Sequence, residues 1–325
     1  MDTKFKKNIV MQNNYICKFG PLQNKTNYTS YKNQYNENYS VGIALTFCDV
    51  FVVKLHPLTI AREFTNCNLK PVMINLVSEK YTDQNIETLE GVYDEILNMR
   101  TNFHCISKQN NNFPPKNEEV IYTPQVMVIR DEMLNVSINN IFTVSFISIT
   151  SKKSDYEILA YKDDNSDNTD SDSDTESENS DNIINKTKNI KLIFSVNTYL
   201  NFKNKLELIF QTAHFAGNNV IIFNDFGCIA DELPVDDIIN IFNSCILNYG
   251  HLFKQIVFAI YVRTPVEQIV YDTFLEKIFK PQDIINNDDN EEDKKQDELL
   301  ANILLQQTKT QTKTQTKTLV KTSTV

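Results

Sequence analysis

The chain is short of the residues that several common kinds of site require. Its 325 residues include only six glycines. A loop that wraps closely around a phosphate needs glycine, because a Cβ blocks the approach of backbone amides. No P-loop, dinucleotide-binding fingerprint or Gly-x-Ser-x-Gly motif occurs. The sequence therefore gives no support to the nucleotide-binding and hydrolase classes that these motifs mark.

Cysteine and histidine are also too scattered to suggest a site. The six cysteines include no Cys-x-x-Cys pair, and the four histidines have no ligand spacing. We therefore expect reduced thiols, no bound metal and no cofactor. No basic stripe stands out, which argues against nucleic acid as a partner. No apolar run approaches the roughly 18 residues of a membrane span, so we expect a soluble, cytoplasmic protein without a membrane partner.

Composition divides the chain into one folded domain and three segments without a folding pattern. Residues 1–40 lack a hydrophobic period and predict a poorly ordered extension, and residues 41–280 predict the domain. Within it lies an insert at 162–188, where nine acidic residues and no basic ones fall between Asp163 and Asp181. Such a segment cannot bury enough apolar surface to fold. The tail, 281–325, ends in Thr-Lys-Thr-Gln repeats and is predicted to be disordered as well.

The acidic insert admits two interpretations. Its alternating run from Ser171 to Glu178 is typical of sites for an acid-directed kinase, and phosphorylation there would create a docking site for a basic protein partner. The alternative is a solvating spacer. Because the net charge is −10 and the stretch from Asp163 to Asp181 carries nine negative charges, the rest of the chain is nearly neutral.

Strand and helix patterns alternate through the domain, which predicts an α/β fold. Alternation of this kind places helices on both faces of a mixed, largely parallel sheet. The predicted strands are 43–55, 71–77, 126–129, 142–149, 220–223 and 255–261, and the predicted helices are 58–67, 86–103, 202–216, 235–249 and 265–279.

Four motifs occur in a fixed order. The first strand ends in Asn75-Leu76-Val77-Ser78-Glu79, and a helix then carries Tyr93-Asp94-Glu95 and Arg100-Thr101-Asn102-Phe103. A second strand reads Tyr122-Thr123-Pro124-Gln125-Val126-Met127-Val128-Ile129-Arg130-Asp131, and Phe226-Gly227-Cys228 forms a late turn. In this order the motifs resemble the microbial-type poly(ADP-ribose) glycohydrolase domain, a branch of the macrodomain superfamily. The resemblance implies a macrodomain-like three-layer α/β/α fold, with ADP-ribose or an ADP-ribosylated protein as the partner.

The resemblance also implies roles for individual residues. Glu95 aligns with the family glutamate that acts as general acid and base, and Asp94 replaces its neighbour. The alternative is that both carboxylates lie on a solvated helix face. Asn75 aligns with an asparagine suited to contact a ribose, although local turn bonding explains an Asn at a strand end equally well.

The late turn is the other candidate for ligand binding. The resemblance assigns Phe226, Gly227 and Cys228 to the ligand. An aromatic residue at a strand end is alternatively part of the core, and Cys228 is alternatively a small buried thiol.

The glycines of the family pattern are missing from both candidate loops. The loop 78–85 has no glycine and two acidic residues, and Ile229 stands where the family has a glycine. The hypothesis we favour is a degenerate module that binds ADP-ribose or another nucleotide weakly and without turnover. An active glycohydrolase using Glu95, and a structural or protein-interaction scaffold, are the alternatives.

Overall fold

The computed structural model describes most of the predicted domain. The described residues are 3–19, 29–32, 48–78, 97, 99–108, 110–116, 119–136, 140–151, 157–162, 190–229 and 232–281. Residues Met1–Phe279 form one compact unit. The acidic insert and nearly all of the tail lie outside the described residues, so the docking role of the insert stays a prediction.

Seven strands form one mixed sheet, in the order β1-β4-β5-β3-β8-β9-β2. Their bounds are β1 (Thr29–Lys32), β2 (Asp49–Val53), β3 (Pro71–Ser78), β4 (Glu119–Val128), β5 (Phe142–Ser151), β8 (Val220–Phe223) and β9 (Gln255–Ala259). Strands β5, β3, β8, β9 and β2 run parallel to one another, and β4 is antiparallel to both β5 and β1. An antiparallel ribbon of β6 (Ile158–Lys162) and β7 (Ile190–Phe194) stands apart from this sheet.

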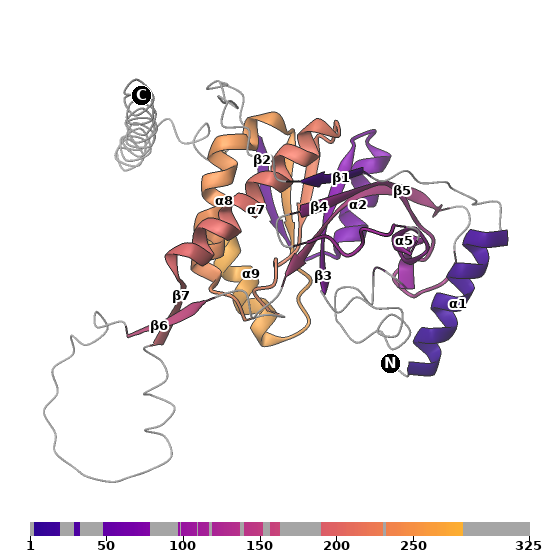
Figure 1. Ribbon diagram of the computed structural model, residues 1–325, viewed down its shortest axis with the longest axis horizontal. Coiled ribbons are helices and arrows are strands. Elements are labelled where there is room, and N and C mark those ends of the chain that lie inside the picture. The colour runs from indigo at the N-terminus through magenta and orange to yellow at the C-terminus, as the bar shows by residue number, and fades with distance from the viewer. Residues whose placement is uncertain are drawn as a thin grey trace, which may run out of the picture. The chain divides into compact units, whose positions relative to one another are not determined.

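Helices cover both faces of the sheet (Figure 1). On one face lie α2 (Pro57–Asn66) and the short α5 (Phe103–Ser107). On the other lie α7 (Val196–Phe215), α8 (Val235–Tyr249) and α9 (Pro265–Lys277). The predicted three-layer α/β/α fold with a mixed, largely parallel sheet is confirmed.

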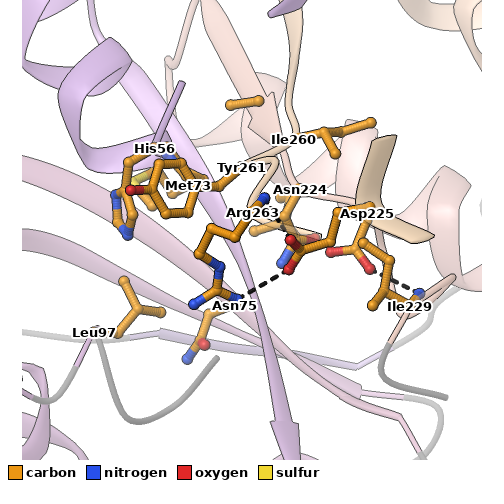
Figure 2. A pocket seen from close by; sticks show the side chains of 14 residues that line it. His56, Met73, Asn75, Leu97, Asn224, Asp225, Ile229, Ile260, Tyr261 and Arg263 are labelled. Carbon is orange, nitrogen blue, oxygen red and sulfur yellow. Dashed lines mark hydrogen bonds and ion pairs between the residues drawn. The ribbon is translucent and has the colours of Figure 1, made fainter. Parts of the chain in front are cut away.

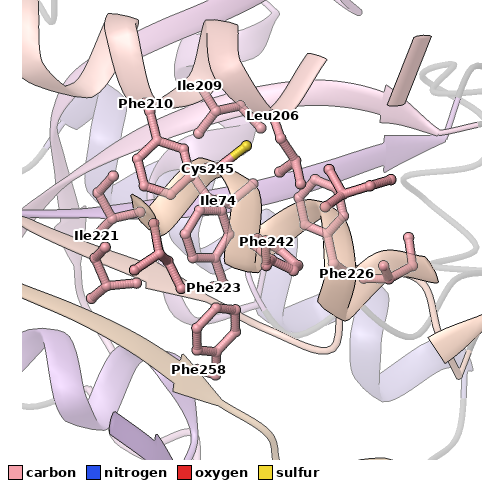
Figure 3. Packing of buried hydrophobic residues seen from close by; sticks show 14 of the residues in the cluster. Ile74, Leu206, Ile209, Phe210, Ile221, Phe223, Phe226, Phe242, Cys245 and Phe258 are labelled. Carbon is pink, nitrogen blue, oxygen red and sulfur yellow. The ribbon is translucent and has the colours of Figure 1, made fainter. Parts of the chain in front are cut away.

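The larger of two apolar clusters fills the space between the sheet and helices α7 to α9. Phenylalanine rings pack against one another within it, beside isoleucine and leucine side chains (Figure 3). The Phe223 ring centroid lies 4.8 Å from that of Phe242 and 5.5 Å from that of Phe258. Strand β8 has only apolar residues and all four are buried, because a central parallel strand is covered on both faces. This core holds the carboxyl ends of the parallel strands in place.

The helix ends follow local sequence signals. Thr264 caps α9 through a reciprocal capping box with Glu267. Gly217, just beyond α7, has a φ of 74°, a conformation that favours glycine. Gly250 follows α8 but has right-handed geometry and begins the 3₁₀ helix η4 (Gly250–Leu252). A Cβ at Gly250 would lie 2.9 Å from Cys48 Sγ, so close packing is the reason for this glycine.

Helix α1 (Thr3–Phe19) and strand β1 lie within the predicted N-terminal extension, 1–40. Polar contacts hold α1 to the domain. The Asn13 side chain donates to the carbonyl of Met99 at 2.9 Å, and the Arg130 guanidinium donates to the side-chain oxygens of Asn13 and Gln12. Such contacts leave no hydrophobic period in the sequence, which is why the pattern gave no signal for this helix.

Element bounds also differ from the prediction. The predicted helix 86–103 is not compared, because it lies mostly outside the described residues. Strand β4 begins at Glu119, earlier than predicted, and its pairing shifts between Thr123 and Val126, where Gln125 has a φ of 55°. A bulge of this kind interrupts the alternation that marks a strand. Among the described helices, none is long and apolar enough to cross a membrane.

Candidate functional site

A cavity of about 170 Å³ lies at the carboxyl ends of β3, β8 and β9 (Figure 2). In parallel sheets this edge is where ligands bind, because the loops and helix N-termini that follow the strands converge there. The walls are largely apolar and include Met73, Ile74, Leu97, Ile229 and Ile260. A mostly apolar cavity with a few polar groups is typical of a small-molecule site.

Asn75 supplies one of these polar groups. Its side chain is 2% exposed, lines the cavity, and donates through Nδ2 to Ser148 Oγ at 3.3 Å. Its Oδ1 atom has no hydrogen-bond partner among the described residues. A buried oxygen left unpaired costs about 1–3 kcal/mol. The geometry therefore suits a ligand that donates an N–H or O–H to Oδ1.

The turn after β8 forms another wall and is closed by its own hydrogen bonds. Asn224 Oδ1 accepts from the backbone N–H of Phe226 at 3.0 Å. The backbone carbonyl of Asp225 accepts from the N–H of Cys228 at 3.0 Å, and Asp225 Oδ2 accepts from the N–H of Ile229 at 3.0 Å. Both Asn224 and Asp225 line the cavity and are buried.

The three turn residues predicted to bind a ligand are placed differently. Phe226 and Gly227 have φ angles of 51° and 85°, and the Phe226 ring packs on Phe202 and Phe242 with centroids 5.3 and 5.4 Å away. Cys228 is buried, and this burial raises the pKa of its thiol well above its usual range. None of the three lines the cavity among the described residues. The left-handed backbone turns the Phe226 ring into the core.

His56 lines the opposite side of the cavity, at the N-cap of α2. Its Nδ1 accepts from the backbone N–H of Leu58 at 3.2 Å and faces the Arg100 Nη1 donor at 3.3 Å. Two donors at Nδ1 assign the proton to Nε2. Burial, helped by the charges of Arg100 and Arg263, lowers the pKa of the His56 ring to about 3. His56 is therefore a neutral ring with an Nε2 donor at pH 7.

Residues just beyond β9 complete the cavity. The Tyr261 ring is half exposed and lies edge-on to His56, with centroids 5.8 Å apart. The Arg263 guanidinium lies 5.5 Å from the centre of the Tyr261 ring and pairs with Glu267 at 3.0 Å. Glu267 also accepts from the backbone N–H groups of Arg263 and Thr264, at 2.6 and 2.7 Å. Burial raises the pKa of this carboxyl, but the hydrogen bonds outweigh burial and lower it.

Glu95 and Asp94, the predicted catalytic pair, lie outside the described residues, and their roles stay predictions. The prediction that the chain binds no metal is a statement about the side chains that ligate metals, which are histidine, cysteine and the carboxylates. Within the described ranges, no group of three or more of these side chains could hold a metal ion.

Sequence analysis found Asn75 and missed His56, Asp225, Tyr261 and Arg263. Tyr261 was assigned to the predicted strand 255–261, whereas β9 ends at Ala259, so the residues that follow turn toward the cavity. The signal that could have found them is position, since each follows the carboxyl end of a parallel strand. Asp225 directly precedes the predicted turn Phe226-Gly227-Cys228 and was not singled out.

Comparison with solved structures places this arrangement in a known fold. A poly(ADP-ribose) glycohydrolase from Thermomonospora curvata superposes with a TM-score of 0.58 at 12% identity, over 83% of this chain and 99% of that one. The chain has the fold of a microbial poly(ADP-ribose) glycohydrolase. The Deinococcus radiodurans glycohydrolase, in complex with ADP-ribose, superposes with a TM-score of 0.52 at 12% identity, over 78% of this chain and 95% of that one. No protein-family model and no curated protein matches the sequence.

Proposed function

We propose that the protein is a macrodomain-like module that binds ADP-ribose or a related nucleotide weakly, and without turnover, in the cavity beside Asn75. The observation that carries this proposal is the unpartnered Oδ1 of Asn75 in a largely apolar cavity at the carboxyl ends of the parallel strands. The Deinococcus radiodurans glycohydrolase that shares the fold is described in complex with ADP-ribose, which supports a ligand of that class.

The proposal of no turnover rests on how the described carboxylates are used. Two of them, Asp225 and Glu267, line the cavity. Glu267 accepts from two backbone N–H groups, and these bonds lower its pKa and favour the ionised form, which has no proton to donate. A general acid must hold a proton and reach the leaving oxygen. Glu267 does not fit that role, and Asp225 Oδ2 is bonded to the Ile229 N–H within its own turn.

The size of the cavity supports binding of one part of a nucleotide. Its volume of about 170 Å³ falls below the roughly 300–1,000 Å³ of pockets for drug-sized ligands. The apolar walls and the Tyr261 ring suit a planar ring system. Asn75 Oδ1 suits a hydroxyl or amino donor of a nucleoside. We therefore propose that the nucleoside part of the ligand supplies most of the contact.

Calorimetric titration of ADP-ribose tests the binding. We expect a dissociation constant between micromolar and millimolar for the wild type, and at least tenfold weaker binding for Asn75→Leu and Tyr261→Ala. Leu275→Ala is the matched control, because this exposed residue on α9 does not line the cavity. Absence of heat at millimolar ADP-ribose would contradict the proposal.

A second assay tests the absence of turnover. The wild type and Glu95→Gln are incubated with an ADP-ribosylated peptide, and released ADP-ribose is measured. We expect no release above background from either protein. Release by the wild type that Glu95→Gln abolishes would show that the protein is a glycohydrolase and would overturn the proposal.

A further inference from the structure

The turn after β8 carries the kind of backbone donors that bind an anion, but three of them already donate within the turn. Residues 226 and 227 both have positive φ, and turns of this kind direct successive N–H groups into a concavity that suits phosphate. Here the N–H groups of Phe226, Cys228 and Ile229 each donate within the turn, at 3.0 Å in every case. The acceptor for Ile229 is a carboxylate oxygen of Asp225. The turn therefore holds a carboxyl group of its own at this position.

The charges around this turn are also unfavourable to a second anion. The described lining residues include one arginine, Arg263, and two carboxylates, Asp225 and Glu267, and Arg263 is already paired with Glu267. His56 is neutral, because its ring pKa is lowered to about 3. Nothing described at this wall offers an unused positive charge to a diphosphate.

We infer that the Asp225 carboxylate takes the place of a ligand phosphate in the turn after β8, so that a diphosphate adds no affinity and the cavity binds nucleosides as tightly as nucleotides. This inference rests on the proposed function and names the ligand class for the same cavity. A phosphate that reached the Ile229 N–H would have to displace Asp225 Oδ2 from 3.0 Å and lie beside a buried like charge. Asp225 is thus a specificity-determining residue, and it explains why ADP-ribose binds weakly.

The inference predicts how affinity depends on the ligand. Adenosine should bind the wild type as tightly as ADP-ribose, to within about threefold, because the diphosphate gains no partner. Asp225→Asn keeps an oxygen acceptor for Ile229 and removes the charge. Two like charges about 4 Å apart repel strongly even at the effective dielectric constant of a protein surface. We expect Asp225→Asn to tighten ADP-ribose binding at least about tenfold and to leave adenosine binding unchanged.

The experiment is calorimetric titration of adenosine, ADP and ADP-ribose into the wild type, Asp225→Asn and Asp49→Asn. Asp49 is the matched control, because it is exposed and begins β2, at the opposite end of the parallel strands from the cavity. Asp49→Asn should change no affinity by more than about twofold. Thermal unfolding checks that both variants fold. If Asp225→Asn does not fold, the affinities of the wild type for the three ligands still test whether the diphosphate adds affinity.

The outcomes separate this inference from the proposed function. If the wild type binds ADP-ribose more than tenfold tighter than adenosine, the inference is overturned and the proposed function stands. The same holds if Asp225→Asn tightens adenosine and ADP-ribose equally. If the wild type binds neither but Asp225→Asn binds ADP-ribose, the role of Asp225 is supported and the proposed function of the wild type fails. If neither protein binds any ligand, both are overturned.

Discussion

The pKa of His56 predicts a specific loss of stability in acid. In the folded protein His56 is neutral down to a pH of about 3, because burial, with Arg100 and Arg263 nearby, lowers its pKa. In the unfolded chain its pKa is about 6.5. Between these two values the unfolded chain binds one more proton than the folded protein. The contribution of His56 to the free energy of unfolding is therefore fully present above pH 6.5 and is lost as the pH falls toward 3.

The magnitude follows from the two pKa values. One extra proton on the unfolded chain changes the free energy of unfolding by about 1.4 kcal/mol per pH unit. With a folded pKa of about 3, His56 contributes a loss of about 3 kcal/mol between pH 7 and pH 4. Carboxylates also titrate in this range, so the contribution of His56 must be isolated with a variant.

His56→Asn is the appropriate variant. Asn is a favoured N-cap residue, and its side-chain oxygen can accept the N–H of Leu58 in place of Nδ1. The variant therefore keeps the start of α2 and removes the titrating group. Urea unfolding at pH 7 and pH 4 should show that the wild type loses about 3 kcal/mol more than His56→Asn.

Two results would refute this reasoning. The first is an equal loss for the wild type and His56→Asn, to within about 0.5 kcal/mol. The second is a titration of the His56 ring between pH 8 and pH 5 in the NMR spectrum of the folded protein. Either result would mean that His56 keeps an ordinary pKa and that the cavity is more hydrated at this wall than the packing around His56 implies.

Three further predictions concern packing and caps. Phe226→Leu should lower stability by about 1–3 kcal/mol because it removes a core ring, whereas Tyr261→Ala should cost less than about 1 kcal/mol and weaken ligand binding. Urea unfolding and ADP-ribose titration of both variants distinguish the two effects. The reverse pattern would contradict the placement of Phe226 in the core and of Tyr261 at the cavity. Gly250→Ala should cost about 1–3 kcal/mol, since its Cβ would meet Cys48 Sγ at 2.9 Å, and thermal unfolding with and without Cys48→Ala should show partial recovery. Thr264→Ala removes the N-cap of α9 and should cost about 1 kcal/mol, with faster amide exchange confined to that helix as the check.

The elements that the sequence predicted well are those with strong local signals. Strand β8 is an unbroken apolar run between polar residues, and its bounds were predicted correctly. The start of α9 at Pro265 was predicted correctly, and Thr264 followed by Pro265 supplies a strong local signal, a capping residue followed by proline. Helix α1 gave no such signal, because its contacts to Arg130 and the carbonyl of Met99 are polar and far apart in sequence. Hydrophobic periodicity does not report contacts of that kind.

The candidate site could be predicted only in part, for a similar reason. Asn75 was found because it lies near the end of a strand with a recognisable motif. The role of Phe226 depended on a backbone angle, since a φ of 51° turns its ring into the core, and composition does not reveal that angle. The sequence patterns did not single out Asp225. Only the structure shows that its carboxylate binds the turn itself.

The measurement that tests the central claim most directly is a crystal structure of the protein with ADP-ribose at a saturating concentration. The account predicts ligand density in the cavity between β3 and β9, with a donor within hydrogen-bond distance of Asn75 Oδ1 and the diphosphate held away from the Asp225 turn. A ligand bound elsewhere, or a diphosphate seated on the N–H groups of Phe226 to Ile229, would contradict the account.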